Sequence, residues 1–228
     1  MKLLVISPEA EDPREHATLA ELFATGLTSY HLRKPTWTRA QLAAWLHALP
    51  PAFHPRIILH THHDLAREFP LGGLHYRDPS RSTCHVLRDK FPLAHSTQSE
   101  APNPVCHVLR DKLLTGTPPF RSRAIHDLST LRASLESDDR LLVSPIFPSF
   151  SKPGHAPDAR LAPAELKSVL ALPRRAEVIA LGGIDASRIP ACRELGFDGV
   201  TVLGAIWQAT DPVNAFSELQ TALLAHAA

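Results

Sequence analysis

Two hydroxyl side chains and a lysine lie close together in one polar stretch of the chain. Ser149 and Ser151 are two residues apart and directly precede Lys152 within segment 144–154. Their hydroxyls can donate hydrogen bonds to phosphate oxygens, and the lysine can add a point charge. The stretch therefore indicates an anion site, while a solvated loop rich in serine and proline is the simpler interpretation.

Two other turns contain glycines that allow the backbone to approach a ligand closely. Gly182 and Gly183 follow one short apolar run, and Leu203 and Gly204 follow the next one. In barrels of alternating strands and helices, the loops after the seventh and eighth strands commonly bind phosphate through main-chain N–H groups. We therefore predict a phosphate cradle here, although glycines also simply permit tight turns.

Three histidines lie at or near the ends of short apolar runs, namely His31, His60 and His126. An imidazole with a pKa near neutrality can both accept and donate a proton, so each is a candidate catalytic base or acid. The alternative for each is a polar side chain without a catalytic role. His60 and His62 also share one face of a strand by period two, which permits a transition-metal pair.

The composition predicts one cytoplasmic domain that binds a small ligand. The 228 residues are 44% hydrophobic and 21% charged, which suits a single large core spanning 1–228. Lys and Arg total 24 against 23 for Asp and Glu, so we expect no nucleic acid or membrane partner. Only four apolar residues in a row precede Ser7, too few for a signal or membrane segment, and the three cysteines show no disulfide spacing. The composition does not decide between a monomer and a homo-oligomer.

Eight short apolar runs alternate with helix-length segments that have an apolar stripe, which predicts a parallel sheet covered by helices. We expect the strands at 3–7, 29–33, 56–61, 73–77, 123–126, 141–146, 177–181 and 199–203. The fold class is α/β, and a closed (β/α)8 TIM barrel is favoured over an open doubly wound sheet. The reason is that Ser-Pro-Glu-Ala at 7–10 replaces the glycine fingerprint of a Rossmann turn. Helix starts are predicted at 12–15, 38–41 (a capping box) and 211–212.

Segment 79–120, between the fourth and fifth strands, is rich in polar residues and proline and is predicted to be an insertion. Within it the heptapeptide Cys-His-Val-Leu-Arg-Asp-Lys occurs twice, at 84–90 and 106–112. A short tandem duplication explains the repeat. The alternative is a four-ligand metal site made by the two Cys-His pairs, which lack the usual C-x2-C spacing.

Several of these motifs resemble those of the thiamin phosphate synthase and thiazole tautomerase family. Segment 144–154 is similar to the family's GPVFPTxTKPG loop, 180–184 to AIGGI, and 196–202 to GADGVAV. Upstream, 30–34 resembles VQLREK and 73–75 resembles GVHL. The matches follow the family order over nearly the whole chain, apart from the insertion.

The resemblance implies a TIM barrel with one of two activities on small phosphorylated substrates. A synthase joins hydroxymethylpyrimidine pyrophosphate to thiazole phosphate with Mg²⁺ and releases pyrophosphate, whereas a tautomerase aromatises a thiazole carboxylate phosphate by moving a proton. By resemblance, Arg33 matches the arginine that binds pyrophosphate, Lys34 beside it is a further candidate for substrate binding, and Ser149, Ser151 and Lys152 match the Thr-x-Thr-Lys set. Gly182, Gly183, Leu203 and Gly204 match the cradle of the thiazole phosphate.

The chain also departs from the family at several site positions. His31 stands where the family has a glutamine. Pro35 stands where the family has a lysine, and Lys34 lies one position before it. His60-Thr61 replaces an Asn-Asp pair whose aspartate helps to hold magnesium. Asp78 lies near the second magnesium aspartate but out of register, and it is the candidate metal ligand. Because Mg²⁺ prefers oxygen ligands, imidazole is a poor substitute. The catalytic histidine of some tautomerases is replaced by Pro145.

The sequence thus predicts thiamin biosynthesis, with pyrimidine transfer to thiazole phosphate and Mg²⁺ as cofactor as the leading activity. One alternative is a metal-independent, tautomerase-like isomerase in which His60 acts as the base. Another is a non-catalytic binder of thiazole phosphate or thiamin phosphate. Pyrophosphate release that depends on magnesium separates the first from the others, and turnover of the carboxylated thiazole separates the second from the third.

Overall fold

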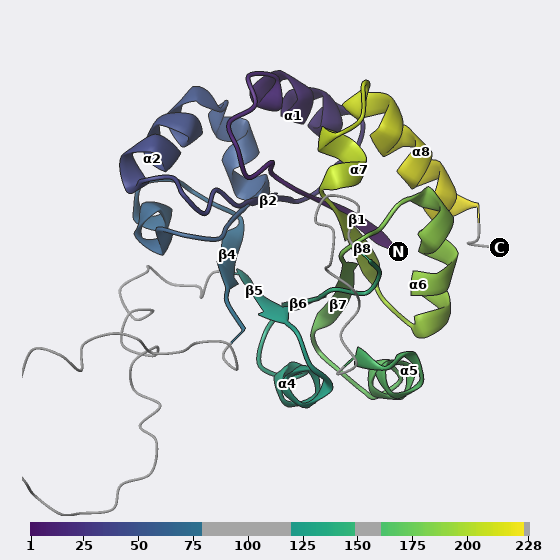
Figure 1. The fold of residues 1–228 in the computed structure, drawn as a ribbon. Coiled ribbons are helices and arrows are strands. Elements are labelled where there is room, and N and C mark those ends of the chain that lie inside the picture. Colours follow the sequence, from purple (N-terminus) through teal and green to yellow (C-terminus); the bar gives the residue numbers. More distant parts are fainter. Residues whose placement is uncertain (79–119, 149–160, 226–228) are drawn as a thin grey trace, which may run out of the picture.

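The strands of the computed structural model, which describes residues 1–78, 120–148 and 161–225, close into a single barrel (Figure 1). Every strand pairs in parallel with its sequence neighbours, and β1 closes the barrel against β8. The strands are β1 (Lys2–Ile6), β2 (Tyr30–Leu32), β3 (Ile57–Leu59), β4 (Gly73–Tyr76), β5 (Phe120–Ile125), β6 (Arg140–Val143), β7 (Glu177–Leu181) and β8 (Gly199–Val202). The predicted (β/α)8 barrel is therefore confirmed, and the open sheet is excluded.

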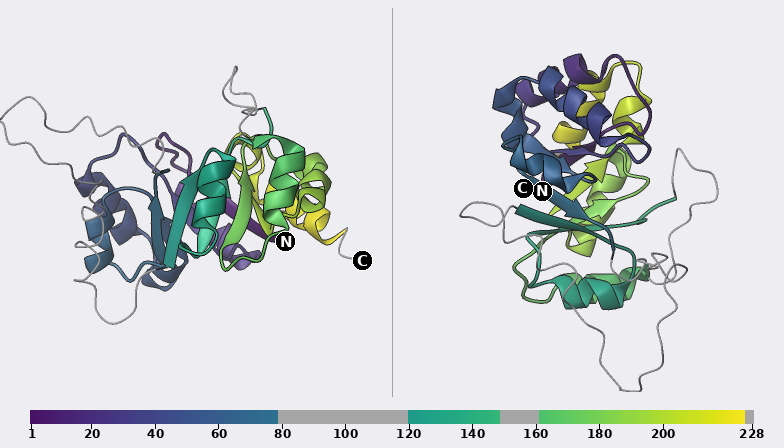
Figure 2. Two further views of the ribbon diagram at one scale, coloured as in Figure 1. Left: turned by 90° about the horizontal axis from the view of Figure 1, so that it is seen from below. Right: turned by 90° about the vertical axis from the view of Figure 1, so that its left-hand side faces the viewer.

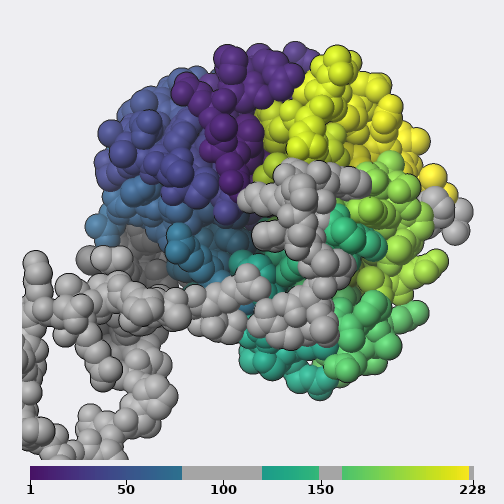
Figure 3. Space-filling view, viewed as in Figure 1, coloured from purple at the N-terminus to yellow at the C-terminus, as the bar shows by residue number. Residues whose placement is uncertain are grey.

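Helices surround the barrel as an outer ring (Figures 1 and 2). They are α1 (Glu15–Ala24), α2 (Arg39–Ala48), α4 (Leu128–Ser134), α5 (Pro163–Leu170), α6 (Ile189–Leu195), α7 (Gly204–Trp207) and α8 (Pro212–Leu224), with 3₁₀ helices η1 (Pro51–Arg56), η2 (His63–Arg67) and η6 (Ala186–Arg188). The N-terminal residues and the C-terminal helices form adjoining surfaces (Figure 3). No helix of the described residues is long and apolar enough to cross a membrane.

Alternate residues of the strands face two different cores. Leu4, Leu142 and Ile179 form a small cluster inside the barrel. Their sequence neighbours, such as Leu3 and Val5, belong to the large cluster between the strands and the helices. This period-two division is what parallel strands buried on both faces require, and it decides which polar residues point inward.

The strand predictions fit within a few residues, and the differences have local causes. Strand β7 has its predicted bounds, whereas β6 ends at Val143 instead of continuing to 146, because the chain turns at Ser144-Pro145. Strand β5 begins at Phe120, three residues before the prediction, because its first residues pair with β4. Phe120 therefore belongs to the barrel and not to an insertion. The rest of the insertion, including both heptapeptides, lies outside the described residues.

Two of the three predicted helix starts are confirmed. Thr38 and Gln41 form the capping box of α2, and Asp211 accepts hydrogen bonds from the N–H groups of Val213 and Asn214 at the start of α8. The prediction for 12–15 was wrong in its placement. Asp12 accepts a hydrogen bond from the main-chain N–H of Arg14, 2.9 Å, and so closes a turn before the helix begins at Glu15.

Candidate functional site

Three histidines from neighbouring strands meet inside the barrel. In β2 the flanking residues Tyr30 and Leu32 pack outward, so His31 points inward. By the same alternation His60, one residue beyond β3, and His75 in β4 also face the interior. Because β2, β3 and β4 are consecutive in the barrel, the three imidazoles lie side by side.

The contacts among these rings are close. Nδ1 of His31 lies 3.0 Å from Nε2 of His60, so one nitrogen donates a hydrogen bond to the other. The rings of His60 and His75 stack with centroids 4.0 Å apart. Nδ1 of His75 is 2.9 Å from the hydroxyl of Ser122 in β5, which extends the polar lining to a fourth strand. We call His31, His60 and His75 the histidine triad.

The environment of the triad favours neutral imidazoles. Burial lowers the pKa of His31 and of His60 well below the ordinary histidine value, and it lowers the pKa of His75 to about 3. Repulsion among the rings and from nearby arginines acts in the same direction. Since a base with a low pKa accepts protons weakly at neutral pH, these shifts count against His60 as the general base.

Arg33 lies one residue beyond β2, at the mouth of the barrel. Its main chain is held by Ser7, whose Oγ accepts from the N–H of Arg33, 2.8 Å, and donates to the carbonyl of Arg33, 2.9 Å. The guanidinium pairs with Glu9 and its side chain is 37% exposed. The backbone of Arg33 is therefore held in place, and its guanidinium can bind an anion if that anion replaces Glu9 as its partner.

Lys34, predicted to bind substrate, lies in the outer layer between the barrel and α1. Its side chain is fully buried, and Nζ donates to Glu15 Oε2, 2.6 Å, and to the carbonyl oxygen of Ala10, 2.9 Å. The ammonium also lies over the ring of Trp37, 4.8 Å from its centroid. In this conformation the ammonium of Lys34 has no exposed face for a phosphate.

The turn after β7 is closely packed against the chain that follows β6. Gly182 and Gly183 have φ of 101° and 61°, in the left-handed region that favours glycine. A Cβ on Gly183 would lie 2.2 Å from the carbonyl oxygen of Pro148. The amides of Ile146 and Phe147 donate to the carbonyls of Leu181 and Gly182, 3.0 and 3.2 Å.

This packing explains why glycine is needed at positions 182 and 183. It does not use the main-chain N–H groups of the two glycines. Within the described residues, the main-chain N–H groups of Gly182 and Gly183 have no hydrogen-bond acceptor. After β8, Leu203 and Gly204 are partly exposed at the start of the short helix α7. The glycine turn is therefore compatible with the predicted phosphate cradle. Ser149, Ser151 and Lys152, predicted to complete it, lie outside the described residues.

His126 lies one residue beyond β5, apart from the histidine triad. Its Nδ1 is 2.8 Å from the carbonyl oxygen of Ser144 and must carry the proton of that hydrogen bond, because a carbonyl can only accept. Nε2 is then the acceptor of the neutral ring. His62, considered as a metal partner of His60, instead directs Nε2 to the carbonyl of Trp37, 3.1 Å.

The residues at the strand ends do not fit a magnesium site of the kind that the resemblance implies. Mg²⁺ takes oxygen ligands in a near-octahedral arrangement. Asp78, two residues beyond β4, is buried, but it is not part of the cluster of possible metal ligands among the described residues, which consists of the histidine triad. The three clustered side chains thus offer nitrogen ligands and no carboxylate oxygen, which is a poor set for magnesium.

Sequence reasoning missed His75 as a member of the site. The signal was present, because Leu74 is apolar and flanked by Gly73 and His75, so period two places His75 on the inner face with His31 and His60. Ser122 in β5 was missed for a different reason, since its strand was predicted to begin one residue later.

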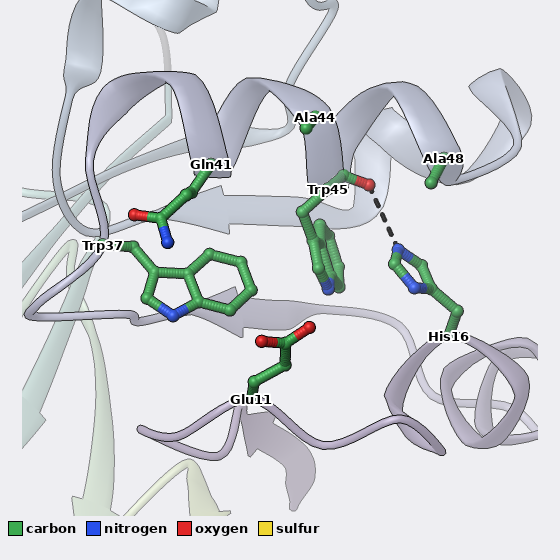
Figure 4. Close-up of a pocket in the computed structure, with 7 residues that line it drawn as sticks. All are labelled: Glu11, His16, Trp37, Gln41, Ala44, Trp45 and Ala48. Carbon is green, nitrogen blue, oxygen red and sulfur yellow. Dashed lines mark hydrogen bonds between the residues drawn. The ribbon is translucent and has the colours of Figure 1, made fainter.

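A separate pocket of about 320 Å³ lies outside the barrel, between α1 and α2 (Figure 4). It is lined by Glu11, His16, Trp37, Gln41, Ala44, Trp45 and Ala48. The ring of His16 stacks on Trp45 with centroids 4.6 Å apart, and its Nε2 hydrogen bonds to the carbonyl of Trp45, 3.1 Å. None of the predicted site residues lines this pocket.

Part of the sequence is similar to curated proteins that share one name. Curated proteins named thiamine-phosphate synthase from Mycolicibacterium gilvum (strain PYR-GCK) and Desulfitobacterium hafniense (strain Y51) are 37% and 36% identical over 99 and 95 residues. The matches cover 42% and 40% of this chain and 40% and 44% of the two relatives, so the chain spans less than half the length of the curated relatives it matches.

A solved structure extends the comparison to the whole barrel. Thiamine phosphate pyrophosphorylase from Bacteroides thetaiotaomicron superposes with a TM-score of 0.68 and 23% identity, and 100% of each chain is covered. At that identity the superposition establishes the fold. No family model matches the chain. Over 99 residues the sequence is similar to a curated thiamine-phosphate synthase, and over its whole length the chain has the fold of a thiamine phosphate pyrophosphorylase.

Proposed function

We propose that this chain forms thiamin phosphate from hydroxymethylpyrimidine pyrophosphate and thiazole phosphate. The observation that carries the proposal is the sequence similarity to curated proteins named thiamine-phosphate synthase. In the reaction the methylene carbon of the pyrimidine loses pyrophosphate, and the thiazole nitrogen forms the new bond to that carbon. Two anionic substrates must therefore be held together at the barrel mouth.

The residues of the barrel mouth support this proposal. The amides of Gly182 and Gly183 would donate to the phosphate of the thiazole, together with the turn at Leu203 and Gly204. Arg33, held by Ser7 at its backbone, would bind the pyrophosphate. Ser149, Ser151 and Lys152 would add hydroxyls and a charge from the segment after β6.

In this proposal a single cytoplasmic domain acts on small phosphorylated substrates. It has no nucleic acid or membrane partner, and both a monomer and a homo-oligomer are compatible with it. The proposal takes no step through magnesium, because the described strand-end residues are not a magnesium set. A tautomerase-like isomerase with His60 as the base is less favoured, since burial lowers the pKa of that imidazole well below its ordinary value.

An assay of thiamin phosphate and pyrophosphate formation tests the proposal directly. The full chain is given both substrates with Mg²⁺, and in parallel with EDTA. We expect thiamin phosphate and pyrophosphate to be formed in equal molar amounts. Turnover of the carboxylated thiazole alone would assign the chain to the isomerase, and binding of thiazole phosphate without any turnover would assign it to the non-catalytic binder.

Lys152 provides a prediction about substrate binding. The variant Lys152→Ala should weaken the binding of thiazole phosphate by about 1.5–3 kcal/mol, the size of a charge-assisted hydrogen bond, with the melting temperature nearly unchanged. Isothermal titration calorimetry and thermal unfolding measure the two quantities. Lys167→Ala, which removes an exposed lysine of α5, is the matched control and should change neither. A lower melting temperature with unaltered affinity would make Lys152 a structural residue.

A further inference from the structure

The histidine triad brings three metal-binding nitrogens together where the family resemblance implies magnesium. Among the described residues, His31, His60 and His75 each offer one ring nitrogen, and the three nitrogens all lie within 4.8 Å of one another. Nitrogen ligands suit zinc and similar transition-metal ions and do not suit magnesium. We propose that the histidine triad binds one transition-metal dication of the zinc class, with an anionic or water oxygen as the fourth ligand.

One of the nitrogen–nitrogen distances in the triad is already close to that of a tetrahedral site. Zn–N bonds of 2.0–2.1 Å place two ligand nitrogens about 3.3 Å apart in a tetrahedral site. The nitrogens of His31 and His60 are already 3.0 Å apart. An ion would replace the proton that these two rings now share, and the ring of His75 would turn from its stacked position beside His60 to complete the set.

Unsatisfied and supporting polar atoms point to the same site. Nε2 of His31 is buried and has no hydrogen-bond partner among the described residues, although the residue is fully enclosed. An orphaned buried nitrogen costs free energy, so the described protein groups alone do not satisfy the polar atoms of the triad. The hydroxyl of Ser122 holds Nδ1 of His75 at 2.9 Å, which is the kind of outer contact that orients a metal-bound histidine.

The charge balance of the site indicates the nature of the fourth ligand. The triad contributes no negative charge, and the guanidinium groups of Arg33, Arg123 and Arg140 act electrostatically on its rings. Each of these guanidinium groups is paired with a carboxylate, on Glu9, Asp138 and Glu177 respectively, so the charge of a dication among neutral imidazoles would be left for the fourth ligand to balance. An oxygen of a phosphate or pyrophosphate group fits both the open coordination position and the surrounding charge.

Titration with Co²⁺, which takes the place of zinc and absorbs visible light, tests the site without substrates. The full chain, freed of metal by a chelator, should bind about one Co²⁺ with the strong visible absorption of a four-coordinate ion, and excess Mg²⁺ should not displace it. The variants His31→Gln and His60→Asn keep polar side chains but remove a nitrogen ligand. Each should weaken binding by more than about 100-fold, beyond the loss typical of a residue in the outer contact layer.

Two control variants separate the triad from other ligands of the chain. His47→Ala removes an exposed histidine of α2, and the double variant Cys84→Ser/Cys106→Ser breaks the repeated Cys-His pairs; both should bind Co²⁺ like the unmodified chain. Since His60 is only partly buried, His60→Asn remains informative if His31→Gln does not fold. No Co²⁺ absorption, unchanged binding in His60→Asn, or loss of binding in the cysteine variant would each overturn the proposal. None of these outcomes depends on thiamin phosphate formation.

Discussion

Lys34 shows how a charged residue beside a predicted site can serve the core instead. It lies with Glu15 and Tyr30 in a buried cluster, in which the tyrosine hydroxyl donates to Glu15 Oε1 over 2.7 Å. Burial raises the pKa of Glu15, and the hydrogen bonds from Lys34 and Tyr30 act against that rise. The ammonium thus compensates a carboxylate that water does not reach.

We predict that Lys34→Met lowers the free energy of unfolding by about 3–5 kcal/mol, because it leaves the Glu15 carboxylate buried without its cation. Urea denaturation measures the loss. The double variant Lys34→Met/Glu15→Gln removes both charges and should recover much of it. If Lys34 instead bound substrate, the single variant would keep its stability and lose affinity for thiazole phosphate.

At the scale of elements, the turn after β7 and the chain after β6 form one unit. The glycine turn at Gly182 and Gly183 packs against Pro145 and Pro148, and Arg188 of η6 donates to the carbonyls of Gly183 and Pro148. The segment that contains Lys152 begins just beyond this unit. Disturbing the glycine turn should therefore affect both stability and phosphate binding.

Gly183→Ala tests this coupling. The new Cβ would meet the main-chain oxygen of Pro148, so we expect a loss of stability larger than the roughly 1–2 kcal/mol of left-handed strain, and weaker binding of thiazole phosphate. Gly196→Ala is the matched control, because that residue also has a positive φ but its Cβ would lie 3.5 Å from Leu170 Cβ. Urea denaturation and calorimetry compare the two. Equal stability losses, with unchanged affinity in both variants, would separate the glycine turn from phosphate binding.

For the whole molecule, an ion cluster at the N-terminal ends of the strands links the first strand to two later ones. Glu177 of β7 accepts hydrogen bonds from Lys2 of β1 and from Arg140 of β6, whose Nη2 lies 2.8 Å from Oε2. Burial tends to raise the pKa of Glu177, but the hydrogen bonds from Lys2 and Arg140 outweigh it and hold the pKa below its ordinary value.

A carboxylate with a lowered pKa in the folded state stabilises the fold above its ordinary pKa, and this contribution is lost as the pH falls through the lowered value. We therefore expect the melting temperature to fall below about pH 4.5. In Glu177→Gln the melting temperature should be lower at neutral pH and should decline less on acidification. Glu165→Gln, an exposed change on α5, should follow the unmodified chain. An identical acid profile in Glu177→Gln would exclude this contribution.

The sequence by itself determined the barrel. Eight apolar runs alternating with helical segments leave few arrangements, and short connections between parallel strands place consecutive strands side by side. The same periodicity assigned Gly182, Gly183 and Arg33 to the strand ends, and the capping box at Thr38 was recognised because its contacts are local.

Only the tertiary structure decided which polar residues meet. Lys34 follows Arg33 directly, yet it belongs to the outer layer because a carboxylate from α1, 19 residues away, lies against it. The histidine triad forms only because β2, β3 and β4 lie side by side and because His75 faces the inside of the barrel, as His31 and His60 do. Periodicity predicts the face on which a side chain lies, but distances across a barrel depend on its closure and on the packing of every strand, which no local pattern contains.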